Sequence, residues 1–203
     1  IGAKIDTNTL YETLFDSTVH SDPDAGGLIN YSYLSGENIT KIQEGRPLFV
    51  RTPNSKMNLA NFFLTQLYAA FAPLKIGMDI LLNEEHVQTD VMVAQGGLFG
   101  TPVIGQQVLA NALNIPITIM NTASEGGPCG MAVLAKYAET YGKESLADYL
   151  DEKVFKNPES MTLTPESAGV KGYESFITRY QAGLPVEALA GDDIKEREEK
   201  GSK

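Results

Sequence analysis

The chain has 203 residues, of which 42% are hydrophobic, a formal net charge of −10 and a single cysteine. This apolar content excludes wholesale disorder, and the length suits one domain with a substantial core. The excess of acidic residues would repel phosphate backbones, so nucleic acid is not expected as a partner.

The first fifty residues predict a helix followed by turns and short extended segments. Thr9–Glu12 has the spacing of a capping box, which would begin a helix that ends near His20. Turn residues of the Asp-Pro and Gly-Gly type follow at 22–27 and stop it. Short strands or extended segments are expected at 28–34 and 48–51.

The longest helical pattern runs from Met57 to about Leu82. Its apolar residues recur at three- and four-residue steps, as on a helix that is buried along one side. Pro73 lies inside the pattern and should kink the helix or split it in two, because proline removes a backbone N–H and crowds the preceding turn. We expect this helix to pack against something large, such as a sheet.

A strand, a glycine pair and a helix start then follow one another. Val91–Ala94 is a short apolar run that leads directly to Gly96 and Gly97. Thr101 has the character of an N-cap, and Pro102 suits the first position of the helix.

The same pattern occurs a second time. The β-branched run Pro116–Met120 predicts a strand, and Gly126 and Gly127 follow it. Pro128 suits the start of the next helix. Strands that alternate with helices in this way favour parallel pairing and right-handed crossovers, as in an α/β fold.

The remaining sequence predicts two further helices and a tail. A short amphipathic helix is expected over 146–155, and another begins at Pro165 and continues through Tyr180. Residues 192–203 mix charges without apolar anchors, as in a solvated tail. We therefore expect one domain over 1–191, followed by the charged tail.

Both glycine pairs fall where an open parallel sheet usually binds its ligand, beyond the carboxyl ends of the strands. Each leads into a helix whose free N–H groups and dipole favour electron-rich ligands, and glycine lets a ring or a ribose approach the backbone. Such turns also occur for tight packing alone, and the pattern leaves both interpretations open. Neither a P-loop nor the dinucleotide fingerprint is present.

Two longer stretches resemble a known family. The first is Gly-Gly-Leu-Phe-Gly-Thr-Pro (96–102) with Gln106, Ala110 and Leu113–Pro116; the second is Ala-Ser-Glu-Gly-Gly-Pro-Cys-Gly-Met-Ala (123–132). Together they resemble the adenosine-binding stretch of the FGGY carbohydrate kinases and look closest to the xylulose and ribulose kinases.

Weaker similarity extends the resemblance from roughly Gly26 to Tyr137. Residues 31–37 resemble the family's loop that ends in Gly-Glu-Arg, although Asn38 stands here in place of the arginine. Residues 58–82 resemble the long helix of the family's second domain.

The resemblance implies a ribonuclease H-like, or actin-like ATPase, α/β fold, with ATP held between two lobes. This chain would be the C-terminal nucleotide-binding lobe, incomplete at its N-terminal end. Gly96 and Gly97 would approach the adenosine, and Thr101 would contact the adenine or ribose. Gly126 and Gly127 would wall the opposite side of the base. Glu125 would add a polar contact there.

The residues for phosphoryl transfer are not found in this sequence. Family members use an Asp of the first lobe to accept the sugar hydroxyl's proton, and a Gly-Thr-Ser hairpin that holds phosphates. We therefore predict no catalytic and no metal-binding residue here, and no activity for the fragment alone. Mg²⁺ would be held mainly by the ATP or ADP and by residues outside the fragment.

The implied function is ATP-dependent phosphorylation of a ketopentose such as xylulose or ribulose. The expected partners are the missing N-terminal lobe of the same polypeptide and the small sugar. Whether the protein forms a homodimer is left open. The alternative is a non-catalytic, actin-like nucleotide-binding module that serves in interaction or sensing. Upstream sequence with the Asp and the hairpin would favour the kinase.

The expected location is the cytoplasm. No apolar run approaches the length of a membrane span, nothing resembling a signal peptide opens the sequence, and the lone Cys129 suits a reducing compartment. The chain begins at Ile1 rather than at Met, so we expect it to be a piece of a longer polypeptide.

Overall fold

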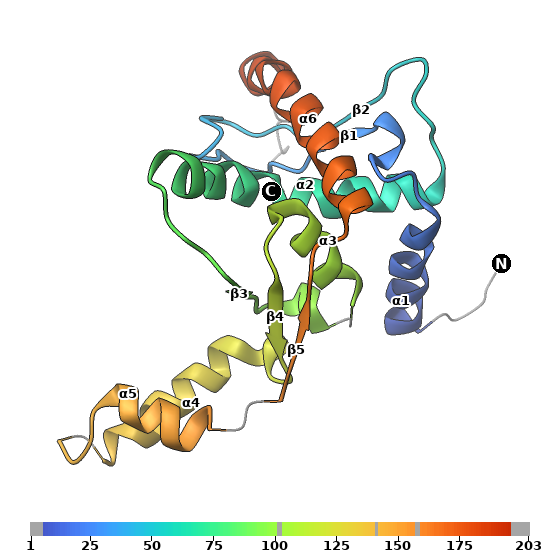
Figure 1. The fold of residues 1–203 in the computed structure, drawn as a ribbon. Coiled ribbons are helices and arrows are strands. Elements are labelled where there is room, and N and C mark those ends of the chain that lie inside the picture. Colours follow the sequence, from blue (N-terminus) through green and yellow to red (C-terminus); the bar gives the residue numbers. More distant parts are fainter. Residues whose placement is uncertain (1–5, 101–102, 141, 157–158, 196–203) are drawn as a thin grey trace, which may run out of the picture. The chain divides into compact units, whose positions relative to one another are not determined.

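The computed structural model describes residues 6–100, 103–140, 142–156 and 159–195 (Figure 1). The helices, in chain order, are α1 (Thr7–Ser17), α2 (Leu59–Asp79), α3 (Ile104–Leu113), α4 (Gly126–Ala138), α5 (Leu146–Tyr149) and α6 (Ser167–Asp193). The strands are β1 (Ile29–Tyr31), β2 (Leu48–Val50), β3 (Met92–Val93), β4 (Ile117–Met120) and β5 (Ser160–Leu163).

The chain divides into two compact units. The first consists of Ile1–Gln88, Asn111–Leu113 and Glu166–Lys203, so it contains the last turn of α3 together with α6. The second consists of Thr89–Ala110 and Asn114–Pro165, which hold both glycine pairs. The candidate site therefore belongs to the second unit.

The core of the first unit is a cluster of aromatic rings from β1, α2 and α6. Its members are Tyr31, Tyr68, Tyr173, Phe176 and Tyr180, all buried. The rings of Tyr68 and Tyr173 lie 4.8 Å apart, and those of Tyr31 and Tyr180 lie 4.7 Å apart. The hydroxyl of Tyr31 donates to the carbonyl oxygen of Tyr180 at 2.7 Å, which satisfies a polar group that burial would otherwise penalise.

The start of α1 differs from the prediction. Asp6, not Thr9, caps the helix, and its carboxylate accepts the backbone N–H of Thr9 at 3.0 Å. Asp is as good an N-cap as Thr, and the helix gains a turn by starting earlier. The end is as predicted, because a short 3₁₀ turn (Thr18–His20) closes the segment.

The long helix α2 is not split at Pro73. Asn58 caps it by accepting the N–H of Asn61 at 2.8 Å, and the helix continues past the proline to Asp79. A π-helical turn (Ile80–Glu84) follows. The predicted short strands at 28–34 and 48–51 are also present, as the antiparallel pair β1–β2.

The second unit contains a three-stranded sheet in the order β3-β4-β5. β3 and β4 are parallel, as predicted, with Met92 beside Ile117. β5, which was not predicted, runs antiparallel to β4. The buried Gln106 of α3 donates through Nε2 to the carbonyl oxygens of Ile117 at 2.7 Å and Met161 at 2.9 Å, so it ties the helix to both strands.

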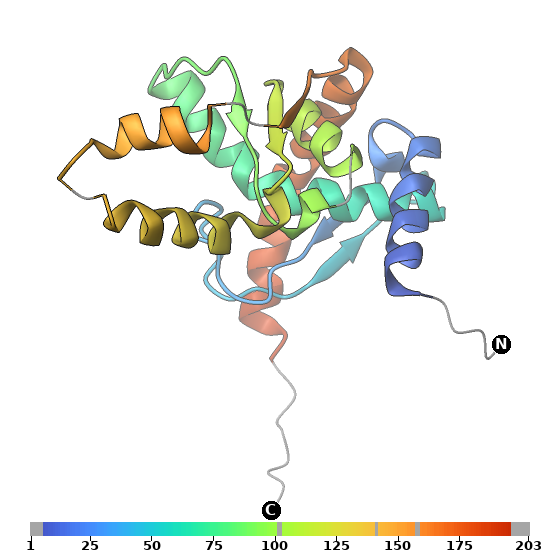
Figure 2. The same cartoon turned by 90° about the horizontal axis from the view of Figure 1, so that it is seen from below.

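The helix α4 carries no fully buried residue and pairs with α5 (Figure 2). The rings of Tyr137 and Tyr149 are 5.3 Å apart, and the Tyr137 hydroxyl donates to the carbonyl oxygen of Glu144 at 3.0 Å. A π-helical turn (Leu150–Val154) completes the helical segment predicted over 146–155.

The last helix is longer than predicted. α6 runs to Asp193 despite Pro185, and so enters the first residues of the predicted tail; residues 196–203 lie outside the described part of the chain. None of the described helices combines the length and apolar character that crossing a lipid bilayer requires.

Candidate functional site

The two glycine turns lie next to each other. Because β3 and β4 are parallel, their carboxyl ends meet at the same edge of the sheet. The backbone N–H of Gly96 donates to the carbonyl oxygen of Ala123 at 2.8 Å, which joins the first turn to the second. The sequence prediction that one ligand could contact both turns therefore has the required geometry.

Two of the four glycines have a structural explanation of their own. Gly96 has a φ of 129°, a conformation that other residues rarely adopt. At Gly126 an added Cβ would overlap the side-chain amide of Gln95. Backbone geometry therefore explains Gly96, whereas a side chain at Gly126 would require only that the exposed end of Gln95 move.

The other two glycines have no such explanation. Gly97 and Gly127 are exposed, and a Cβ added at either would meet no atom within 4 Å. Neither has a positive φ. Because Gly97 and Gly127 have no side chain, the backbone is exposed at both residues, on either side of the hydrogen bond from Gly96 to Ala123.

The start of α4 differs from the prediction. The helix begins at Gly126, so both glycines lie in its first turn and Pro128 is its third residue rather than its first. The preceding residue, Glu125, makes no side-chain capping bond. Its side chain is exposed, and its N–H donates to the carbonyl oxygen of Thr122 at 3.0 Å. The first N–H groups of α4 are thus available to a ligand.

Thr101 and Pro102 lie outside the described residues. The contact expected of Thr101 with the adenine or ribose therefore stays a prediction. α3 begins at Ile104, two residues later than the predicted start at Pro102. Val103 precedes it with a φ of 76°, which is unusual for a β-branched residue.

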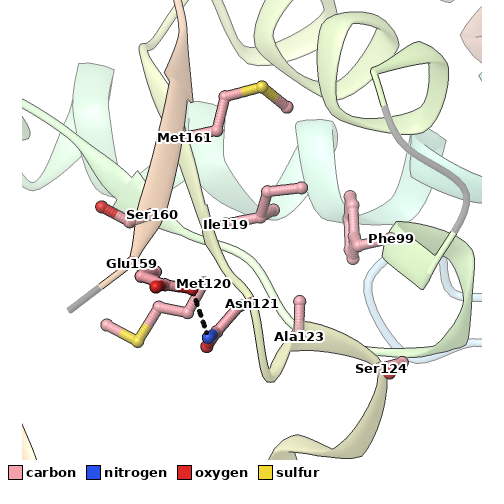
Figure 3. A pocket seen from close by; sticks show the side chains of 9 residues that line it. All are labelled: Phe99, Ile119, Met120, Asn121, Ala123, Ser124, Glu159, Ser160 and Met161. Atoms are coloured by element: carbon pink, nitrogen blue, oxygen red, sulfur yellow. Dashed lines mark hydrogen bonds between the residues drawn. The ribbon is translucent and has the colours of Figure 1, made fainter.

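A cavity of about 410 Å³ opens beside the two turns (Figure 3). Phe99 comes from the first turn, Ser124 from the second, and the ends of β4 and β5 complete the wall. The lining residues are Phe99, Ile119, Met120, Asn121, Ala123, Ser124, Glu159, Ser160 and Met161. A cavity of this size can hold a nucleoside.

A second cavity of about 300 Å³ lies against α4 and α5. Gln95, Gly126 and Cys129 are among its lining residues, and most of the others are aliphatic. Cys129 is half-buried there.

None of the five predicted site residues that the structure describes lines the first cavity. Three of its lining residues illustrate what the sequence did not show: Phe99, Asn121 and Glu159. Phe99 stood inside the recognised motif, but nothing marked its side chain. Asn121 follows a predicted strand directly, which is a weak signal for a site. Glu159 gave no signal, because it is 38 residues further on and precedes the unpredicted β5.

The charge around the turns is unusual for a phosphate site. Residues 89–135 contain neither Lys nor Arg. The described residues also contain no group of three His, Cys, Asp or Glu side chains that could hold a metal ion. The described part of the site thus offers backbone N–H groups, a cavity and acceptor oxygens.

Comparison with known proteins identifies the family. The sequence profile of the C-terminal domain of the FGGY family of carbohydrate kinases matches residues 2–139, which is more than half of the chain. The chain belongs to this family. No curated protein sequence gives a significant match.

Solved structures share the fold at low identity. Gluconate kinase from Lactobacillus acidophilus is 18% identical with a TM-score of 0.72, over 94% of this chain and 37% of that one. Xylulose kinase from Rhodospirillum rubrum is 17% identical with a TM-score of 0.69, over 89% and 34%. Plasmodium falciparum glycerol kinase with ADP is 16% identical with a TM-score of 0.60, over 95% and 35%.

These matches confirm the predicted fold class, a mixed α/β fold of the ribonuclease H-like, actin-like ATPase type. The chain spans 34–37% of the length of the three structures named, so it corresponds to a part of each.

Proposed function

We propose that the chain is the nucleotide-binding lobe of an ATP-dependent sugar kinase. The observation that carries this proposal is the hydrogen bond from Gly96 to Ala123 between the two turns, with open backbone at Gly97 and Gly127 on either side. In this proposal Gly96, Gly97, Gly126 and Gly127 hold the adenosine of ATP or ADP. Thr101 and Glu125 would add polar contacts.

Phosphoryl transfer would need groups that the segment around the two turns lacks. Charge around the transferred phosphate has to be stabilised by cations, and none stands between residues 89 and 135. We propose that an N-terminal lobe of the same polypeptide supplies the catalytic Asp and most of the sugar site. Mg²⁺ would be held mainly by the nucleotide and by residues of that lobe.

The proposed substrate is a ketopentose such as xylulose or ribulose. The motif resemblance supports this choice, as do structural neighbours described as xylulose kinases. A gluconate kinase and a glycerol kinase also share the fold, so the sugar is to be tested directly. We place the protein in the cytoplasm, where ATP and free sugars meet.

Calorimetric titration with ADP tests the nucleotide site. We expect weak but measurable binding, and at least a tenfold loss in Gly97→Leu and Gly127→Leu, because each side chain would occupy the open surface. Ala135→Leu is the matched control, since it places the same leucine side chain at an exposed position of α4 two turns further on. Unchanged ADP affinity in both glycine variants would contradict the assignment.

A second assay tests whether the catalytic groups lie in the N-terminal lobe. The purified chain should phosphorylate no ketopentose with ATP, whereas a polypeptide with the N-terminal lobe should do so. Turnover by the chain alone would contradict the proposal that catalytic groups lie elsewhere. Nucleotide binding without transfer in the longer protein would instead favour a non-catalytic sensor.

A further inference from the structure

The sheet of the second unit has an unpaired edge along β3. β4 lies between β3 and β5 (Figure 1), and among the described strands β3 pairs with β4 alone. The N–H of Met92 donates to the carbonyl oxygen of Pro116 at 2.9 Å, so Met92 faces β4. Because the backbone groups of successive residues point to opposite sides of a strand, those of Val91 and Val93 point away from β4. No backbone group of the described residues pairs with them on that side.

The side chains along this edge are apolar and only half covered. Val91 is 48% exposed and Val93 is 50% exposed, although β-branched residues gain their stability in a sheet by packing against neighbours. Residues 91–97 include neither a charged residue nor a proline. Charges and prolines are the means by which natural proteins keep an edge strand from pairing, so this edge is open to a further strand.

The opposite edge of the same sheet is protected. β5 follows directly on Glu159 and ends two residues before Pro165. Ser160 and Thr162 give it polar side chains between these two ends. A charge, a proline and polar side chains all oppose the addition of a strand. Of the two edges, β3 is therefore the one suited to accept a partner.

The helix α4 of the same unit is also uncovered. Residues 126–135 carry no charge, and Met131 and Leu134 are 69% and 49% exposed. None of the residues of α4 is fully buried. An apolar helix normally packs one side against a sheet or another helix. The second unit thus presents more apolar surface than its own described elements cover, which is typical of an interaction site.

We propose that a strand from another part of the same polypeptide, outside these 203 residues, pairs with β3 and makes it an inner strand of the sheet. The inference rests on the proposed function, in which this chain is one lobe of a longer kinase. The chain spans 34–37% of the three solved kinases named above. A polypeptide of their length has ample sequence to supply such a strand.

The length and the charge of the chain favour a tethered strand over a second copy of the chain. β3 has only two residues, and pairing over so short a length is weak between separate molecules. A flexible tether raises the effective concentration of a strand to roughly the millimolar range without any new contact. Two copies would also bring together molecules that each carry a net charge of −10 and repel one another.

Amide hydrogen exchange, resolved by residue in NMR spectra, tests the pairing. In the chain alone the N–H of Val93 should exchange fast, whereas β4 protects that of Met92. In a polypeptide that includes the N-terminal lobe, we expect the Val93 amide to exchange roughly 100-fold more slowly, because it becomes part of the ladder. Met92 is the internal control, since its bond to β4 is the same in both proteins.

Proline at position 93 gives an independent test, because it removes an N–H that faces away from β4. Val93→Pro should change the urea midpoint of the chain alone very little and should lower that of the longer polypeptide. Met92→Pro is the matched control. It removes the donor to Pro116 and should lower both midpoints.

The outcomes separate this inference from the proposed function. Equally fast exchange of Val93 in both proteins, or equal effects of Val93→Pro on both, would overturn the pairing, while ADP titration and kinase assays still decide the function. Protection of Val93 in the chain alone that increases with protein concentration would assign the edge to a second copy and would also overturn it. A longer polypeptide that protects Val93 but binds no ADP would support the pairing and contradict the proposed function.

Discussion

Replacement of Gly172 by alanine should destabilise the first unit. A methyl group at this position of α6 would overlap the carbonyl oxygen of Pro23, which also accepts the hydroxyl of Tyr68 at 2.8 Å. Both sides of the contact are backbone, so one of them has to move, at about 1–3 kcal/mol. A lost hydrogen bond adds about 1 kcal/mol, and alanine returns about 1 kcal/mol as the better helix former. The expected net loss is about 1–3 kcal/mol.

Urea unfolding measures this change. Near-ultraviolet circular dichroism is a suitable signal, because the chain has nine tyrosines and no tryptophan. Gly130→Ala is the control. Gly130 is also in a helix, but a Cβ there meets no atom within 4 Å, so alanine should be neutral or should stabilise α4 by up to about 1 kcal/mol. An unfolding midpoint for Gly172→Ala equal to that of the parent chain would refute the close approach of α6 to Pro23.

Two further substitutions test buried polar groups. Burial raises the pKa of Glu187, whose Oε1 accepts the Arg46 N–H at 2.7 Å while Oε2 has no partner. The stability that comes from its protonated form is present below the unfolded pKa, about 4.3, and is lost as pH rises through the raised pKa. As pH rises above about 4.3, the urea midpoint of Glu187→Gln should therefore increase relative to that of the parent chain. A difference between the two midpoints that does not change with pH would refute this. Gln106→Ala should lower the free energy of unfolding by about 2–4 kcal/mol, because it leaves a cavity and leaves the carbonyl oxygens of Ile117 and Met161 without their donor. Amide hydrogen exchange should become faster, and only in the second unit.

The sequence predicted the parts of the fold that rest on local pattern. The periodicity of 57–82 identified α2 because a helix buried along one side imposes its period on the apolar residues. The short apolar runs that end at Ala94 and Met120 identified β3 and β4, and the helix between them implied their parallel pairing. The position of the glycine pairs at one edge of the sheet followed from that pairing.

The parts that were missed depend on neighbours distant in sequence. β5 has the sequence Ser-Met-Thr-Leu, which alternates polar and apolar residues over only four positions and becomes a strand by pairing with β4. Asn121 and Glu159 lie next to each other only through that pairing. Helix starts also differed, because Asp6 competes with Thr9 as a cap and a glycine pair can continue into a helix as easily as it can precede one.

In the proposed function, recognition of the nucleoside is separate from the handling of the phosphates. Between residues 89 and 135 there is no cationic side chain, and a protein of net charge −10 adds no favourable long-range field for an anion. The turns do offer the open backbone at Gly97 and Gly127 and the cavity that Phe99 lines, and these features suit uncharged groups. If this lobe holds the base and the ribose, the charge of the phosphates has to be balanced by Mg²⁺ and by residues of another lobe. Placing the neutral contacts and the charged contacts on different lobes would make phosphoryl transfer depend on their closing around the same nucleotide, which is the arrangement that excludes water from the reaction.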